Sequence, residues 1–220
     1  MLEEMITELY HRGATIVKVV DISMLSKQET KEYSKAFLIG IALEPGYLLR
    51  QSLEETIDHS GFGDAEHRVG ELAEWLAEDI VRKGYLAYAQ SDRNLINDFY
   101  NEATRSSSLP HKKIAVMAGL GWIGKSNLLI TPNYGSALSM CSVLTDLPIP
   151  TDNAPMLTSQ CEPCSLCRDI CPTGAIHGIA WEPGIHRDRI VDIKICEGCL
   201  KCLIHCPWTQ NYGRHPDAKI

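Results

Sequence analysis

Two cysteine runs decide the organisation of this sequence: CEPCSLCRDICP at 161–172 and CEGCLKCLIHCP at 196–207. Each run spaces its four cysteines as C-x2-C-x2-C-x3-C and ends on a proline. Eight of the nine cysteines lie in these runs, and Cys141 stands alone. The acidic start MLEEMITELY shows no basic export signal, so we expect a cytoplasmic protein with reduced thiols. Metal binding is therefore favoured over a disulfide framework.

The spacing is that of bacterial ferredoxins with two [4Fe-4S] clusters. Three closely spaced thiolates wrap one cube, and the fourth, one helical turn further on, points toward the neighbouring cube. The alternative is two four-cysteine zinc sites, which usually pair C-x2-C knuckles from separate hairpins. Three closely spaced cysteine ligands in each run favour an iron–sulfur cluster over a zinc site. The predicted ligand sets cross between the runs: Cys161, Cys164, Cys167 and Cys206 for one cluster, and Cys196, Cys199, Cys202 and Cys171 for the other.

The composition disfavours two classes of partner, nucleic acids and membranes. The 220 residues include 28 acidic and 21 basic side chains, for a net charge of -7. Proteins that hold nucleic acid by its phosphates usually carry a basic surplus, so the charge disfavours nucleic acid as a partner. No apolar run approaches the roughly 18 residues of a membrane helix, and we expect no membrane association.

The first 150 residues mix helical and strand patterns, and a Pro-rich, polar stretch at 147–155 is typical of a linker. We therefore predict two domains, 1–150 and 151–220. Apolar residues at helical spacing predict helices, and β-branched or continuous apolar runs predict strands. The predicted helices cover 2–9, 64–84 and 95–103, and the predicted strands cover 14–22, 35–43, 85–89, 127–131 and 136–146.

A glycine-rich stretch, GLGWIGKS at 119–126, matches both the phosphate-loop and the dinucleotide-binding patterns. Both patterns need a helix after the loop, because the phosphate lies on the helix N-terminus. Pro132 follows Gly124 by only eight residues and leaves no room for such a helix. We therefore interpret the stretch as a turn between a helix and a strand, with tight packing and ligand binding both left open.

Three features occur in one order: AGLGWIGKSNLLITPNYGS at 118–136, SVLTDLPI at 142–149, and then the two cysteine runs. Together they resemble epoxyqueuosine reductase and its relatives, which share their architecture with reductive dehalogenases. The resemblance implies an α+β fold, with a mixed α/β nitroreductase-like N-terminal domain before a two-cluster ferredoxin-like module. It also implies a cobalamin beside the nearer cluster. Residues implied to bind it are Gly119, Leu120, Gly121, Trp122, Gly124, Lys125, Asn127 and Thr145.

Two departures from that family affect the expected reaction. Its tRNA-acting members carry a helical-repeat extension after the cluster module, and this sequence ends at Ile220, as a short form would. They also carry a proton-donating aspartate in a D-[ST]-G-P stretch, where this chain has SSSLP at 106–110. A serine donates a proton less readily than a carboxylic acid. The remaining catalytic candidates are Ser108 and Asp146, although an acid after a strand more often caps a turn.

The leading functional hypothesis is an iron–sulfur oxidoreductase that feeds electrons to a corrinoid for reduction of a small substrate. An electron-donor protein such as ferredoxin or flavodoxin would supply it. The alternative is an electron-transfer protein or subunit without a substrate site of its own. A flavin in place of cobalamin is a third reading. Cys141, inside an apolar strand pattern, is expected to be a buried inert thiol, with an axial ligand or nucleophile as the alternative.

Overall fold

A computed structural model describes residues 1–94 and 99–217. The chain forms two compact units, each assembled from three segments. Unit 1 comprises Met1–Ile41, Gly63–Ala118 and Ser139–Pro155, and unit 2 comprises Ala42–Phe62, Gly119–Leu138 and Met156–Ile220. No helix in the described part of the chain is long and apolar enough to cross a membrane.

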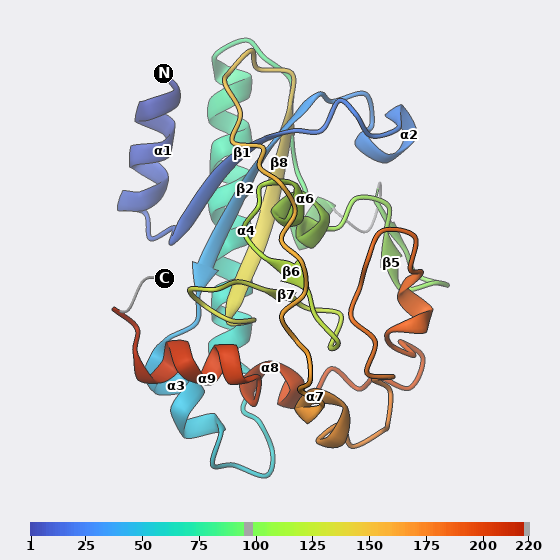
Figure 1. Cartoon of the computed structure of the whole chain (residues 1–220). Coiled ribbons are helices and arrows are strands. Elements are labelled where there is room, and N and C mark those ends of the chain that lie inside the picture. The colour runs from blue at the N-terminus through green and yellow to red at the C-terminus, as the bar shows by residue number, and fades with distance from the viewer. Residues whose placement is uncertain (95–98, 218–220) are drawn as a thin grey trace. The chain divides into compact units, whose positions relative to one another are not determined.

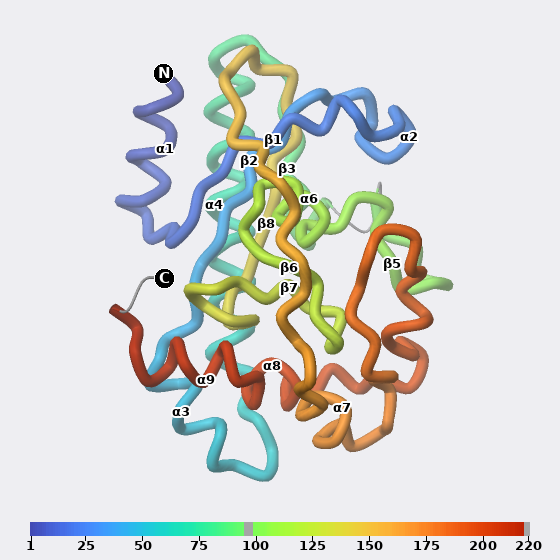
Figure 2. Tube along the Cα trace, viewed as in Figure 1, coloured from blue at the N-terminus to red at the C-terminus, as the bar shows by residue number. Residues whose placement is uncertain are grey.

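A four-stranded sheet in the order β1-β2-β8-β3 forms the centre of unit 1 (Figures 1 and 2). Strands β1 and β2 pair antiparallel, with Val17 opposite Ile39, and β3 pairs antiparallel with β8. The two central strands are buried along most of their length, as their continuous apolar sequences predict. The strand bounds are β1 Ile16–Asp21, β2 Lys35–Ala42, β3 Ala87–Ala89 and β8 Leu138–Thr145.

Two long amphipathic helices confirm the periodicity predictions. Helix α4 (Ser60–Arg82) runs behind the sheet in Figure 1 and buries a stripe that includes Val69, Leu72 and Leu76. Helix α1 (Leu2–His11) buries Met5 and Leu9 in the same way. Two shorter helices, α2 (Lys27–Thr30) and α6 (His111–Met117), complete the helices of unit 1 within the described ranges.

The prediction of a helix over 95–103 is wrong for residues 99–103. Residues 95–98 lie outside the described residues. Strand β4 (Tyr100–Asn101) pairs instead with β5 (Ser106–Ser107). The Asn101 side chain accepts a hydrogen bond from the Thr104 backbone nitrogen at 3.1 Å. Such local side-chain contacts compete with helix formation and favour a turn.

The stretch predicted as a linker lies along the outer edge of β1. The backbone nitrogen of Val19 donates to the Asp152 carboxylate at 2.9 Å, and that of Asp21 donates to the Asn153 amide oxygen at 2.7 Å. Side chains of this stretch thus satisfy edge donors that would otherwise stay unpaired. The segment is consequently part of unit 1.

Unit 2 contains short helices and one small hairpin. Helix α3 packs against α9, and the Tyr212 hydroxyl donates to the Leu43 carbonyl at 3.1 Å (Figure 1). The hairpin of β6 and β7 pairs Trp122 with Ile130. The bounds are α3 Pro45–Gln51, β6 Trp122–Ile123, β7 Leu129–Ile130, α7 Leu166–Asp169, a 3-10 turn at Arg187–Arg189, α8 Lys201–Ile204 and α9 Pro207–Arg214.

These units divide the chain differently from the domains predicted at 1–150 and 151–220, which stay a prediction. The glycine-rich segment 119–138 groups with the cysteine-rich segment in unit 2.

Candidate metal centre

Five cysteines from both runs line one cavity of about 240 Å³ in unit 2, called here the first cavity. Cys167 lies on α7, while Cys206 occupies the N-cap position of α9, directly before Pro207. The proline suits the first turn of a helix, where no backbone donor is needed. Four of the five are the set predicted for one cluster, Cys161, Cys164, Cys167 and Cys206, and the fifth is Cys202.

The other predicted set lines a second cavity of about 160 Å³ in unit 2. Its cysteines are Cys171, Cys196, Cys199 and Cys202. Ala175, Ile176 and Val191 form a small buried apolar cluster against which several of these cysteines pack. Cys202 and Ser126 also line the first cavity, so the two cavities share part of their walls. Each predicted set thus lines one cavity, with Cys202 lining both, and the crossed assignment stays a prediction.

Burial and crowding make bare thiolates unfavourable in these cavities. Burial raises the pKa of Cys202 to about 12, and the neighbouring thiols, Cys167 foremost, add to the rise. Burial likewise raises the pKa of Cys167 to about 11, assisted by Cys161 and Cys206. A bound metal reverses this preference, because its positive charge stabilises the coordinating thiolate. Eight thiols, two of them buried and six half-buried, that line two adjoining cavities therefore fit iron–sulfur clusters.

The second cavity holds one exception. Burial raises the pKa of the Cys171 thiol, but hydrogen bonds from Thr173 and from backbone nitrogens outweigh it and leave that pKa lowered. The hydroxyl of Thr173 lies 3.7 Å from the Cys171 sulfur. Donors of this kind stabilise a thiolate ligand. Within residues 1–94 and 99–217, no three His, Cys, Asp or Glu side chains converge as ligands of one single ion. A cubane differs from such a site because it spreads its four thiolates over four irons.

The glycine-rich stretch 119–126 follows helix α6 in the chain, as predicted, but it contains strand β6, which the sequence did not predict. Two of its side chains contact the cysteine segment. The Trp122 indole nitrogen donates to the Cys161 sulfur at 3.4 Å, and the Lys125 ammonium donates to the Cys164 carbonyl at 3.0 Å. Asn127, in a left-handed conformation with φ 62°, lines the second cavity.

The glycines of this turn are explained by close packing. A Cβ on Gly121 would lie 2.0 Å from the Ile130 carbonyl oxygen, and one on Gly124 would lie 3.1 Å from the Cys161 sulfur. Gly119 adopts φ 65°, and Leu120, the residue after it, is half-buried. Of the two readings left open by the sequence, these contacts favour tight packing.

Three candidate site residues lie in unit 1, and each takes part in a hydrogen bond with a backbone group: Thr145, Asp146 and Ser108. The Thr145 hydroxyl donates to the Leu86 carbonyl at 2.7 Å, and the Asp146 carboxylate accepts from the Leu86 nitrogen at 2.8 Å. Asp146 thus caps the end of β8, which was the alternative to a catalytic role. The backbone nitrogen of Ser108 donates to the Phe99 carbonyl at 2.9 Å. Cys141 is buried, as expected, and burial raises its pKa to about 12.

Unit 1 contains a cavity of about 380 Å³ that the sequence did not predict. Glu74 on its wall accepts from the Ser91 hydroxyl at 2.9 Å and pairs with Arg93 at 3.2 Å. Gln90, 1% exposed, also lines it, and its Oε1 has no hydrogen-bond partner within the described ranges. A water or a ligand donor would complete that amide. The sequence feature that could have indicated this cavity is the polar run Gln90-Ser91-Asp92, which follows a strand.

The sequence is similar to several curated epoxyqueuosine reductases. It is 30% identical to the enzyme of Pseudomonas aeruginosa over 159 residues, which are 65% of this chain and 39% of that one. It is 38% identical to the enzyme of Bacillus anthracis over 132 residues, which are 52% of this chain and 34% of that one. The chain thus spans about two fifths or less of these relatives. No family model matches.

Solved structures show the same fold. The catabolic reductive dehalogenase NpRdhA superposes with a TM-score of 0.74 at 20% identity, over 97% of this chain and 33% of that one. Epoxyqueuosine reductase from Bacillus subtilis superposes with a TM-score of 0.59 at 14% identity, over 95% of this chain and 65% of that one. The fold is therefore the mixed α/β fold of these reductases. The chain is similar in sequence to part of the epoxyqueuosine reductases, which confirms the resemblance expected from its motifs.

Proposed function

We propose that the chain is an iron–sulfur reductase in which two [4Fe-4S] clusters pass electrons toward a bound corrinoid that reduces a small molecule. The observation that carries the cluster part is that all eight cysteines of the two runs line two cavities with a shared wall. The clusters supply one-electron transfer when bound. The protein's own part is to bind the irons, keep water from the sulfurs and hold the two clusters next to each other.

The nitroreductase-like and ferredoxin-like character of the two parts, and the corrinoid, are proposed from the similar proteins, which include a reductive dehalogenase with B12-dependent dehalogenation. The described contacts do not define a cradle for a corrinoid. Trp122 and Lys125, which were expected in that pocket, contact the cysteine segment instead. The electron donor of the protein is proposed to be a ferredoxin or flavodoxin. The small-molecule substrate is likewise part of the proposal.

Paired cysteine substitutions test the cluster assignment. Protein purified without oxygen is expected to carry about eight irons, four for each cubane. If the ligand sets cross, the double variant Cys161→Ala/Cys206→Ala loses one cluster and keeps about half of the iron. The double variant Cys161→Ala/Cys171→Ala then loses both clusters. An assignment that keeps each run to one cluster reverses the two results. Zinc in place of iron would overturn the cluster proposal.

Reconstitution with hydroxocobalamin separates the two candidate functions. Under the leading proposal, the protein retains the corrinoid through gel filtration and shows its absorption bands. The second candidate, an electron-transfer protein without a substrate site, is favoured by the engagement of Trp122 and Lys125 at the cysteines. It predicts no retained corrinoid and only cluster waves in voltammetry. A yellow supernatant after acid precipitation would point to flavin instead.

A further inference from the structure

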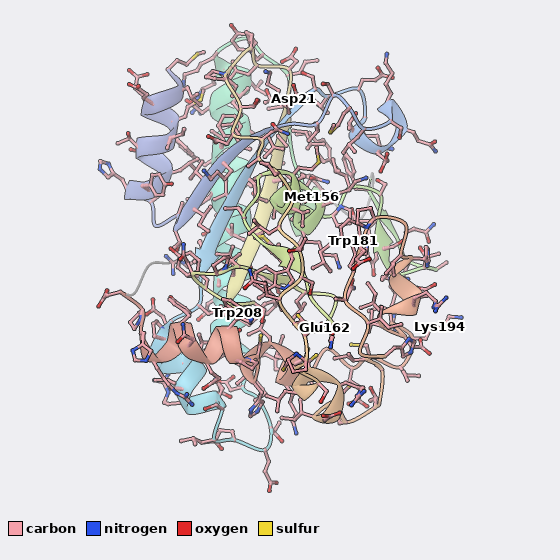
Figure 3. All side chains as sticks on the ribbon, viewed as in Figure 1. Asp21, Met156, Glu162, Trp181, Lys194 and Trp208 are labelled. Carbon is pink, nitrogen blue, oxygen red and sulfur yellow. The ribbon has the colours of Figure 1, made fainter. Side chains whose placement is uncertain are left out.

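The indole of Trp122 is directed at a predicted cluster ligand. Trp122 is 2% exposed and packs in one buried group with Ile130, Cys161 and Cys206. Its Nε1 donates to the Cys161 sulfur at 3.4 Å. Trp208 of α9, labelled in Figure 3, meets the Trp122 ring edge-on with ring centroids 5.1 Å apart and restrains its orientation. The donor is thus fixed by packing.

Lys125 places a positive charge at the same cavity. Its side chain lines the first cavity, the residue is 9% exposed, and the ammonium donates to the Cys164 carbonyl at 3.0 Å. A carbonyl oxygen has no net charge to offset the ammonium. Buried charges interact strongly because little water screens them. The charge of Lys125 therefore acts on whatever occupies the first cavity.

The glycine-rich turn holds both side chains in place. The contacts that a Cβ would make at Gly121 and Gly124 show how tightly the turn fits against Ile130 and Cys161. The turn and the β6–β7 hairpin thus form one tightly packed element next to Cys161. Trp122 and Lys125 approach the first cavity from the same turn.

We propose that Trp122 and Lys125 raise the reduction potential of the cluster bound in the first cavity. Reduction adds an electron whose charge spreads onto the cluster sulfurs. An N–H donor to a ligand sulfur and a nearby cation both stabilise that charge, and hydrogen bonding and net charge are known determinants of cluster potential. This inference rests on the proposed function only in requiring the two clusters.

The second cavity has its own donors, which come from other residues. The Thr173 hydroxyl and backbone nitrogens after Cys171 contact the Cys171 sulfur. Changes at Trp122 or Lys125 leave these contacts in place. Substitutions in the glycine-rich turn should therefore shift one cluster potential and spare the other.

The test is a redox titration of the anaerobically purified full chain, followed by electron paramagnetic resonance and visible absorption. Trp122→Phe and Lys125→Met are each expected to lower one of the two potentials and leave the other unchanged. Lys125→Arg, which keeps the charge, should retain most of the wild-type value. Trp181→Phe is the matched control, because Trp181 lies in unit 2 but does not line either cysteine cavity.

The loss of an indole could also disturb folding. Replacement of Trp122 by β-(3-benzothienyl)alanine keeps the ring shape and removes only the N–H donor, and it should lower the same potential. Unchanged potentials in this variant and in Lys125→Met, with a full iron content, would overturn the inference while leaving the clusters intact. Wild-type protein without iron–sulfur clusters would instead overturn the proposed function.

Discussion

The Thr209 hydroxyl accepts a hydrogen bond from the Ser136 backbone nitrogen at 3.0 Å, and both residues are buried. This contact joins the segment after the glycine-rich turn to the first turn of α9. Cys206 is the N-cap of that helix. The position of one predicted cluster ligand therefore depends on a contact with a part of the chain far away in sequence.

Thr209→Val should destabilise the protein by about 1–3 kcal/mol, because it leaves a buried backbone donor without an acceptor. Thr209→Ser keeps the hydroxyl and should retain most of the stability. Denaturant unfolding without oxygen, followed by circular dichroism, measures both. Equal losses in the two variants would show that the methyl group, and not the hydrogen bond, matters.

Gly135→Ala should be more damaging. Gly135 has φ 57°, and a Cβ there would lie 2.2 Å from the Thr209 backbone nitrogen. The start of α9 would have to move and carry Cys206 with it. We expect a lower Tm and a loss of about half of the iron, since one cluster would lose a ligand. Gly84→Ala is the control, because Gly84 has φ 89° but open space around it. Full iron in Gly135→Ala would contradict this account.

His111 should make stability depend on pH. Burial lowers its pKa to about 4, and its Nδ1 lies 3.0 Å from the Ser142 hydroxyl. The unfolded chain therefore takes up a proton near pH 6.5 that the folded chain does not, so stability falls as pH falls. The loss between pH 7.5 and 5.5 is about 1 kcal/mol.

His111→Asn should remove that part of the pH dependence. The measurement is the difference in Tm between wild type and variant at each pH, which cancels effects common to both. A difference that does not change between pH 7.5 and 5.5 would show that His111 is protonated equally in the folded and unfolded chains.

Cys141 should be chemically inert in the folded protein. Burial raises its pKa to about 12, so its reactive thiolate is scarce at neutral pH. Iodoacetamide should leave it unmodified until the chain is denatured, as mass spectrometry can measure. Cys141→Ala should keep the full iron content. Rapid alkylation of native protein would instead support the nucleophile alternative.

The sequence was most informative where covalent spacing fixes geometry. The intervals between cysteines predicted two ligand sets, and the members of each set lie together on the wall of one cavity, with Cys202 on the walls of both. Apolar periodicity predicted α1 and α4, because the burial of one face dominates the folding of a long helix. The short β4–β5 hairpin was missed, since local contacts such as that of Asn101 leave little periodic signal.

The glycine-rich turn shows a different limit. Its pattern could not distinguish a ligand loop from tight packing, because both need residues without side chains. Only the fold brings Ile130 and Cys161 close enough to Gly121 and Gly124 to favour packing. The partnership of Thr209 with Ser136 was equally invisible, since 73 positions separate them.

The grouping of segments 42–62 and 119–138 with the cysteine runs has a practical consequence. A fragment that begins at residue 151 would contain both cysteine runs of a two-cluster ferredoxin. It would lack the residues that contact α9 and the indole beside Cys161. The cysteine-rich segment thus depends on the other segments of unit 2 and cannot be transferred to another protein as an independent domain.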